Sequence, residues 1–252
     1  MEHGIHIALA PYILFHIGGF PVTSSMVAAW VTMVVLVVAA FFIGRNVKLI
    51  PNKFQAAVEG AFGFFVSYME EVLENKMLAR RYFPLIMTIF LYILFTNLFG
   101  LLPIIGSVGI ETVSHGEHGF TPLLYPTNTD LNMTLALAVV AFVVIEFAGI
   151  TALGFLRYAS KFVNFKSAIG FVVGLIELVS EVARLVTFSF RLFGNIFAGK
   201  VLILVALFFV PYILPVPLLV YEVFVALIQG AVFALLTLFF IKIAVTDHAE
   251  AH

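Results

Sequence analysis

Long apolar runs alternate with short polar or basic stretches along the chain. Five runs are long enough for a membrane-crossing helix, and they cover residues 26–44, 82–102, 131–156, 170–209 and 218–245. An α-helix rises about 1.5 Å per residue, so about 20 apolar residues span the hydrocarbon core of a bilayer. The pattern predicts an all-α integral membrane protein with five membrane crossings, built as a single membrane domain over residues 1–252.

The stretch 53–76 differs from these runs because charged residues recur within it. Its apolar positions are spaced by three or four residues and share one side of a helix, while four glutamates lie among them. Four carboxylates are too costly for a crossing, so we expect an amphipathic helix at the membrane interface.

The run 170–209 is too long to stand upright in a bilayer. As one helix it would extend about 60 Å, roughly twice the hydrocarbon thickness. Three prolines, Pro211, Pro215 and Pro217, then mark a turn before the last run. We therefore expect the last two helices to form a long antiparallel hairpin that is tilted in the membrane.

Composition supports a membrane protein and excludes several other classes. Hydrophobic residues make up 63% of the chain and charged residues 11%, with a mean hydropathy of +1.15. The net charge of −1 predicts no nucleic-acid partner. The absence of cysteine excludes disulfides, thiol nucleophiles and iron–sulfur ligation, and no glycine-rich nucleotide loop or metal motif indicates a cofactor.

The basic residues predict the orientation. With five crossings, ten of the 13 Lys and Arg residues fall on one side, and the other three lie within the run 170–209. The positive-inside rule then places the N-terminus outside and the C-terminus in the cytoplasm. The first residues lack the basic region of a secretory signal, so we expect no cleavage there.

Charged residues inside the long run are the first candidates for function. Arg191 is flanked deeply by apolar residues on both sides, and an intramembrane charge is functional by default. Glu177, Arg184 and Arg191 recur every seven residues on one helix face, with Asn195 one turn further. Glu181 and Arg184 could instead be ordinary surface charges on a protruding helix end.

The hairpin predicts which residues lie at the same depth. Arg191 and Gln229 are equally far along the chain from the turn at 210–211, and so are Lys200 and Glu222. We expect Gln229 to hold Arg191 or a water chain, and Lys200 to pair with Glu222 through their opposite charges. No carboxylate of this chain is level with Arg191, so its partner should lie on another subunit.

Four motifs carry a resemblance to a known family. They are R-L-F-G-N with A-G at 191–199, T-N-L-x-G-L-x-P at 96–103, P-T-N-T-D-L-N at 126–132 and Q-G-x-x-F at 229–233. With these motifs the chain resembles subunit a of the F-type ATP synthases, over about residues 22–242.

The resemblance implies a non-catalytic subunit of a bacterial inner-membrane complex. Its implied function is proton translocation through two offset half-channels, beside a rotating ring of carboxylate-bearing c subunits and with b-type peripheral stalk subunits as further partners. Arg191 would separate the half-channels at the ring interface, and Gln229 would be the amide of the last helix. We expect Arg191, Leu192 and Asn195 to face the ring and Leu202 to point away from it.

Several positions depart from the family pattern or allow two interpretations. Lys200 and Glu222 replace the family's usual residues, which makes Glu222 the better proton relay, and Phe240 lacks the hydroxyl that some relatives have there. Asp130 is interpreted first as a helix cap and alternatively as a channel residue. Glu177, with Ser180 and Thr187, occupies positions associated with the inner half-channel, or contacts headgroups and neighbouring helices.

Two other function classes compete with this interpretation. A self-contained secondary transporter or ion channel should show inverted repeats or broken helices, and the sequence shows neither. An intramembrane hydrolase needs paired aspartates or a metal motif, whereas Asp130 and Asp247 are the only aspartates and both lie near membrane edges.

Overall fold

The computed structural model describes residues 11–114, 117–162 and 168–246, so Asp247 lies outside the described residues. Five helices are long and apolar enough to cross a membrane. They are α1 (Ser24–Arg45), α3 (Lys76–Gly100), α4 (Leu131–Leu153), α6 (Ala168–Phe209) and α7 (Pro215–Val245). The predicted all-α membrane fold is confirmed, and the chain is a multi-pass membrane protein.

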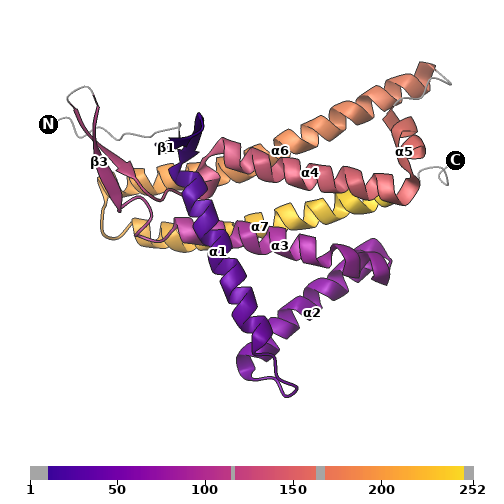
Figure 1. Cartoon of the computed structure of the whole chain (residues 1–252), viewed down its shortest axis with the longest axis horizontal. Coiled ribbons are helices and arrows are strands. Elements are labelled where there is room, and N and C mark those ends of the chain that lie inside the picture. The colour runs from indigo at the N-terminus through magenta and orange to yellow at the C-terminus, as the bar shows by residue number, and fades with distance from the viewer. Residues whose placement is uncertain (1–10, 115–116, 163–167, 247–252) are drawn as a thin grey trace.

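Four of these helices form a bundle and the other crosses it. Figure 1 shows α3, α4, α6 and α7 side by side along the long axis of the molecule, while α1 runs across them. α1 has 22 residues and measures about 33 Å, close to the hydrocarbon thickness, whereas the 42 residues of α6 measure about 63 Å. The two directions differ, so both helices cannot lie along the membrane normal, and the longer one must be tilted.

The helix α2 (Lys53–Leu73) corresponds to the predicted amphipathic helix. Its N-terminus is capped by the side chain of Asn52, which accepts a hydrogen bond from the backbone N–H of Gln55. It ends where Glu74 adopts a left-handed conformation with φ of 54°, three residues before the predicted limit at 76.

The structure corrects the predicted start of α3. This helix begins at Lys76 rather than at residue 82, because Asn75 caps it and accepts hydrogen bonds from the backbone N–H groups of Met77 and Leu78. Arg80 and Arg81 therefore belong to the helix. The sequence prediction treated them as a boundary because they are charged, although long basic side chains can extend from a helix end to the interface.

The predicted third crossing is also shorter than expected. α4 ends at Leu153 instead of 156, because Gly154 has φ of 83°, and an α-helix cannot continue through a residue in this conformation. A separate short helix, α5 (Phe155–Phe162), follows it and was not predicted. It packs against both α4 and α6.

The hairpin of α6 and α7 forms as predicted in outline. The chain turns over residues 210–214, and α7 begins at Pro215 rather than at residue 218. Proline is tolerated in the first helical turn because its missing N–H would have no partner there. Pro215 and Pro217 thus belong to the helix and not to the turn.

Two β-hairpins were not predicted. One consists of β1 (Ile13–Ile17) and β2 (Phe20–Thr23), and the other of β3 (Gly109–Ser114) and β4 (Glu117–Pro122). The hydroxyl of Ser24 donates to the carbonyl of Pro122, which ties the start of α1 to the second hairpin. A short 3₁₀ helix, η1 (Thr127–Thr129), leads from there into α4.

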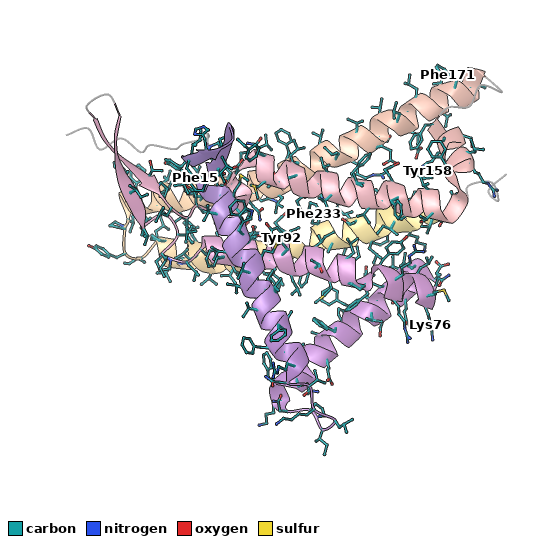
Figure 2. The ribbon with its side chains drawn as sticks, viewed as in Figure 1. Phe15, Lys76, Tyr92, Tyr158, Phe171 and Phe233 are labelled. Atoms are coloured by element: carbon teal, nitrogen blue, oxygen red, sulfur yellow. The ribbon has the colours of Figure 1, made fainter. Side chains whose placement is uncertain are left out.

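Small residues allow the bundle helices to pack closely. Ala138, Ala141 and Ala148 of α4 are fully buried. At Gly230 of α7, a Cβ atom would lie 3.1 Å from the carbonyl oxygen of Phe90, so α3 and α7 approach through their backbones. Larger core side chains such as Phe233 fill the space between the helices, while Phe171 at the start of α6 is exposed (Figure 2).

Candidate functional site

Arg191 lies near the middle of α6 and is half-buried. Within the described part of the chain it forms no ion pair within 4.0 Å and no hydrogen bond through its side chain. Its neighbours Ser189 and Leu192 point into the bundle, and the Ser189 hydroxyl lies 3.1 Å from that of Thr134 on α4. The guanidinium is therefore a permanent charge without an internal partner.

The face of α6 beyond Arg191 differs from the expected one. Asn195 is exposed, as predicted for a residue that faces a partner, but Leu192 is only 1% exposed and packs in the core. Leu202 is 47% exposed and lies seven residues after Asn195, on the same side of the helix. Two expectations about this face were therefore wrong. Leu192 does not face outward, and Leu202 does not point away from the surface that carries Asn195.

A surface groove of about 340 Å³ runs between α6 and α7, and we call it the hairpin groove. Its polar lining consists of Asn195, Glu222 and Gln229, together with Tyr221. Gln229 is largely buried and opens into this groove. No hydrogen bond joins it to Arg191 among the described residues, so the expected direct contact is not formed.

A second cavity, of about 160 Å³, is lined by residues of α3, α6, α7 and the segment before α4. We call it the loop-end cavity, and its polar lining is Asn97, Thr129, Lys200 and Glu222. The Asn97 side chain is 4% exposed and accepts a hydrogen bond of 2.6 Å from Asn128. Its amide nitrogen has no partner in the described part of the chain, so it can donate to a water molecule or another acceptor.

Glu222 lines both the hairpin groove and the loop-end cavity. The residue is 4% exposed, and its carboxylate occupies the space that Gly199 leaves on α6. A Cβ atom at Gly199 would lie 1.8 Å from one carboxylate oxygen. The glycine of the R-L-F-G-N-x-x-A-G motif thus makes room for this acid between the two spaces.

The expected pairing of Lys200 with Glu222 is not formed. Among the described residues, the two form no ion pair within 4.0 Å, and the Lys200 ammonium instead lies 3.2 Å from the ring centroid of Tyr125. Burial, and then the neighbouring Tyr12, raise the pKa of Tyr125 to about 12, so its ring is neutral at physiological pH. Equal depth was a sound inference for this pair, but an aromatic face from a distant loop attracts the cation instead.

Asp130 serves as the helix cap that the first interpretation expected. Its carboxylate accepts a hydrogen bond of 3.0 Å from the backbone N–H of Asn132 and another of 2.6 Å from the hydroxyl of Ser25. The residue is 5% exposed and links α1 to the start of α4.

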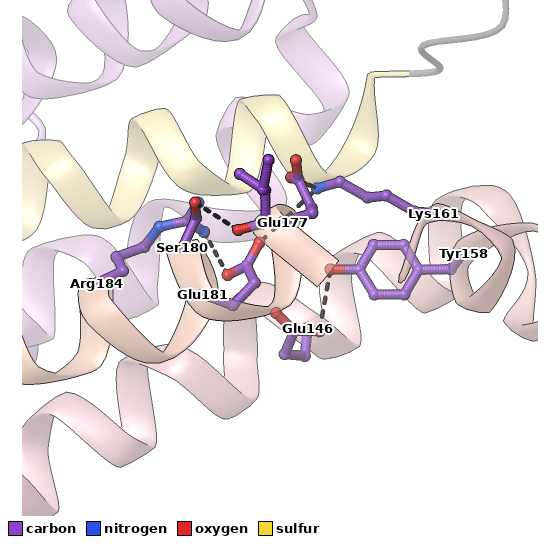
Figure 3. Close-up of polar contacts among 8 residues, drawn as sticks. Glu146, Tyr158, Lys161, Glu177, Ser180, Glu181 and Arg184 are labelled. Atoms are coloured by element: carbon purple, nitrogen blue, oxygen red, sulfur yellow. Dashed lines mark hydrogen bonds and ion pairs between the residues drawn. The ribbon is translucent and has the colours of Figure 1, made fainter. Parts of the chain in front are cut away.

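The opposite end of the bundle carries a network of charges, shown in Figure 3. The Lys161 ammonium of α5 lies 2.6 Å from Glu177 and 3.7 Å from Glu181, and Arg184 lies 2.6 Å from Glu181. We call this network, with Glu146 and Tyr158, the basic-end cluster. Glu181 is 3% exposed, which rules out the alternative that it is a surface charge.

The aromatic ring of Phe240 supports this cluster. The Arg184 guanidinium lies 3.7 Å from the Phe240 ring centroid, within the range of a cation–π contact. Phe240, at a position where some relatives have a hydroxyl, therefore contacts Arg184 through its aromatic ring, and this contact requires no hydroxyl.

Sequence reasoning missed the role of Glu146 and Tyr158 in this cluster. The Tyr158 hydroxyl donates a hydrogen bond of 3.0 Å to one oxygen of Glu146, and the other oxygen is buried without a partner. Burial and the adjacent Glu146 raise the pKa of Tyr158. One signal was available, since Glu146 is the only charged residue within 131–153.

Comparison with known proteins gives a consistent result. The family described as ATP synthase A chain matches residues 26–242. Among similar proteins named ATP synthase subunit a, that of Moorella thermoacetica is 31% identical over 94% of this chain and 98% of its own length. That of Gloeobacter violaceus is 34% identical over 90% and 86%, and that of Campylobacter jejuni subsp. doylei is 33% identical over 81% of both chains.

Proposed function

The chain belongs to the ATP synthase A chain family, and we propose that it conducts protons across the membrane beside a rotating ring of c subunits, as the non-catalytic membrane subunit that couples proton flow to ATP synthesis. The observation that carries this proposal is the position of Glu222. Its carboxylate lines both the loop-end cavity and the hairpin groove. A proton that enters the cavity can bind this carboxylate and leave it toward the groove, where Asn195 and Gln229 offer polar atoms.

Arg191 supplies the second part of the mechanism. Its guanidinium keeps its proton at any accessible pH, so it acts by its charge and carries no proton itself. A carboxylate on a neighbouring ring helix would lose its proton opposite this charge, because an adjacent cation lowers a carboxyl pKa. The absence of an internal partner among the described residues leaves the guanidinium available for that role.

The two polar sites lie at different positions along α6, so the two halves of the proposed proton path are offset from each other. The loop-end cavity lies beyond Arg191 along α6, whereas Glu177 and the rest of the basic-end cluster lie before it. We propose that the first site serves the outer half-channel and the second the cytoplasmic one. Asp130, which is buried beside Thr129 of the cavity lining, would hold the outer wall in place.

The exposed apolar faces suggest where partners bind. We propose that the ring covers the face of α6 that carries Asn195 and Leu202, which are both exposed. The apolar faces of α1 and α2, which diverge from the bundle in Figure 1, would receive b-type stalk helices and lipid. The bacterial relatives support placement in a bacterial inner membrane. The basic residues support an orientation with the N-terminus outside and the C-terminus in the cytoplasm.

Replacement of Arg191 tests this function directly. We expect Arg191→Ala to abolish ATP-driven proton pumping by assembled complexes in proteoliposomes, measured by quenching of a pH-sensitive dye. Arg191→Lys should fail as well, because a compact ammonium does not reproduce the planar guanidinium. Arg45→Ala, which removes an exposed cation at the end of α1, is the control and should pump normally. Pumping by Arg191→Ala at the rate of this control would overturn the proposal.

A further inference from the structure

The basic-end cluster contains one more carboxylate than it has cations. Glu146, Glu177 and Glu181 face Lys161 and Arg184, so the cluster carries a net charge of −1 when every group is ionised. Partly buried charges without compensation are unfavourable, and one bound proton makes this cluster neutral. The geometry identifies which carboxylate receives it.

Glu146 is the carboxylate without a cation. Glu177 and Glu181 each have an ammonium or guanidinium at 2.6 Å, whereas Glu146 forms no ion pair within 4.0 Å among the described residues. An adjacent cation favours the ionised form of a carboxyl group, and Glu146 lacks such a neighbour. Its unpartnered, buried oxygen is the atom that is free to bind a proton.

Tyr158 orients this carboxylate from α5. Its hydroxyl donates to the other oxygen of Glu146, and its raised pKa keeps it a donor at physiological pH. The tyrosine ring packs on Gly149 of α4, where a Cβ atom would lie 2.2 Å from a ring carbon. Figure 3 shows the Tyr158 hydroxyl directed at Glu146, with Glu181 and Arg184 on the neighbouring α6.

We propose that Glu146 is a further proton-holding residue of the transport path at the basic end, with Tyr158 as its positioning residue. This inference rests on the proposed function. A proton from water binds the free oxygen of Glu146 and makes the side chain a neutral acid, while Tyr158 continues to donate to the second oxygen. On release the proton returns to water past Glu177, which is more exposed than Glu181, and the Glu146 carboxylate is restored.

Glu146→Gln tests the inference because glutamine keeps an oxygen that accepts from Tyr158 and cannot hold the proton. We expect the pumping rate of assembled proteoliposomes to fall about tenfold or more. The loss should grow as the pH on the basic-end side rises, where protons are scarce and a holding site matters most. Glu71→Gln, on the exposed side of α2, is the matched control and should leave the rate unchanged.

Infrared difference spectroscopy of the wild-type complex gives a readout that a purely structural contact would not change. A pH titration should show a protonated carboxyl band that is absent in Glu146→Gln, retained in Glu71→Gln and shifted in Tyr158→Phe, which removes the hydrogen bond. If Glu146→Gln does not assemble, the test rests on the wild type and Tyr158→Phe: a protonated carboxyl band that shifts in Tyr158→Phe supports the assignment to Glu146.

The outcomes separate this inference from the proposed function. Normal pumping and an unchanged band in Glu146→Gln, while Arg191→Ala is inactive, would overturn the inference and leave the function standing. A titration of the wild type without a band that responds to Tyr158→Phe would overturn it too. An assembled wild-type complex that pumps no protons would instead refute the proposed function.

Discussion

Gly199→Ala is the sharpest test of the position of Glu222. The added Cβ would lie 1.8 Å from a Glu222 oxygen and 2.3 Å from its carboxyl carbon, whereas ordinary contacts begin at 3.4 Å, so the carboxylate must move by about 1.6 Å. Alanine favours a helix over glycine by about 1 kcal/mol, and overpacking costs about 1–3 kcal/mol, so the net loss of folding free energy is about 0–2 kcal/mol. The protein should therefore fold.

The effect on transport should be much larger than the effect on stability. Displacement by more than about 1 Å moves a proton-transferring group out of hydrogen-bond reach and can reduce a rate about 100-fold. We expect ATP-driven pumping in proteoliposomes to fall about 10- to 100-fold. Gly60→Ala in α2, where no atom of the chain lies within 4 Å of the added carbon, is the control for the same substitution in a helix.

A second variant separates displacement of the carboxylate from general damage. Glu222→Asp shortens the side chain by one carbon–carbon bond, about 1.5 Å, which nearly equals the shift that the alanine imposes. The double variant Gly199→Ala, Glu222→Asp should therefore pump better than Gly199→Ala alone. If Gly199→Ala pumps like Gly60→Ala, the carboxylate does not act from the space beside Gly199 and the argument fails.

Two further predictions concern the partner surface and Lys200. A cysteine at Asn195 should crosslink to a ring helix and one at Leu192 should not, because the first is exposed and the second is buried; crosslinks at Leu192 alone would refute the assignment of this face. Tyr125→Leu should raise the labelling of Lys200 by an amine reagent roughly 2- to 30-fold, since a cation–π contact contributes about 0.5–2 kcal/mol. Tyr125→Phe should label like the wild type at any pH below about 12, because burial raises the pKa of Tyr125 and its ring is neutral there. Equal labelling of the leucine and phenylalanine variants would show that the ring does not hold the ammonium.

Periodicity and length predicted the helices because each crossing must satisfy its own backbone hydrogen bonds in lipid. The boundaries were less predictable, since they depend on single residues whose conformation the pattern does not reveal. Gly154 ends α4 through a positive φ, and Pro215 begins α7 because the first turn needs no N–H. The short α5 begins directly after Gly154, so the same residue separates it from α4.

The site was predictable where it depends on one helix and unpredictable where it depends on distant segments. Arg191 and Asn195 could be identified from their positions in an apolar run. The contact between Tyr125 and Lys200 joins a loop to α6, and the contact between Tyr158 and Glu146 joins α5 to α4. Equal depth on a hairpin therefore indicated which residues are level, but it did not indicate which side chain each one contacts.

In the proposed function, the order of charges along α6 would prevent the two polar sites from forming a leak within this chain. Arg184 of the basic-end cluster and Gly199 beside Glu222 are separated by roughly 20 Å of helix, and Arg191 lies between them. A proton about 10 Å from that guanidinium is repelled by roughly 1.5–2 kcal/mol at an effective dielectric of 20, which reduces its occupancy about 10- to 30-fold, and by more in a less polar environment. Glu146 and Glu222 both lack a cation within 4.0 Å among the described residues, as the proposed binding and release of protons at each end requires. In the proposed function a proton would pass from one to the other only as the neutral acid of a moving carboxylate, which the Arg191 charge does not repel. Coupling to rotation would follow from that requirement.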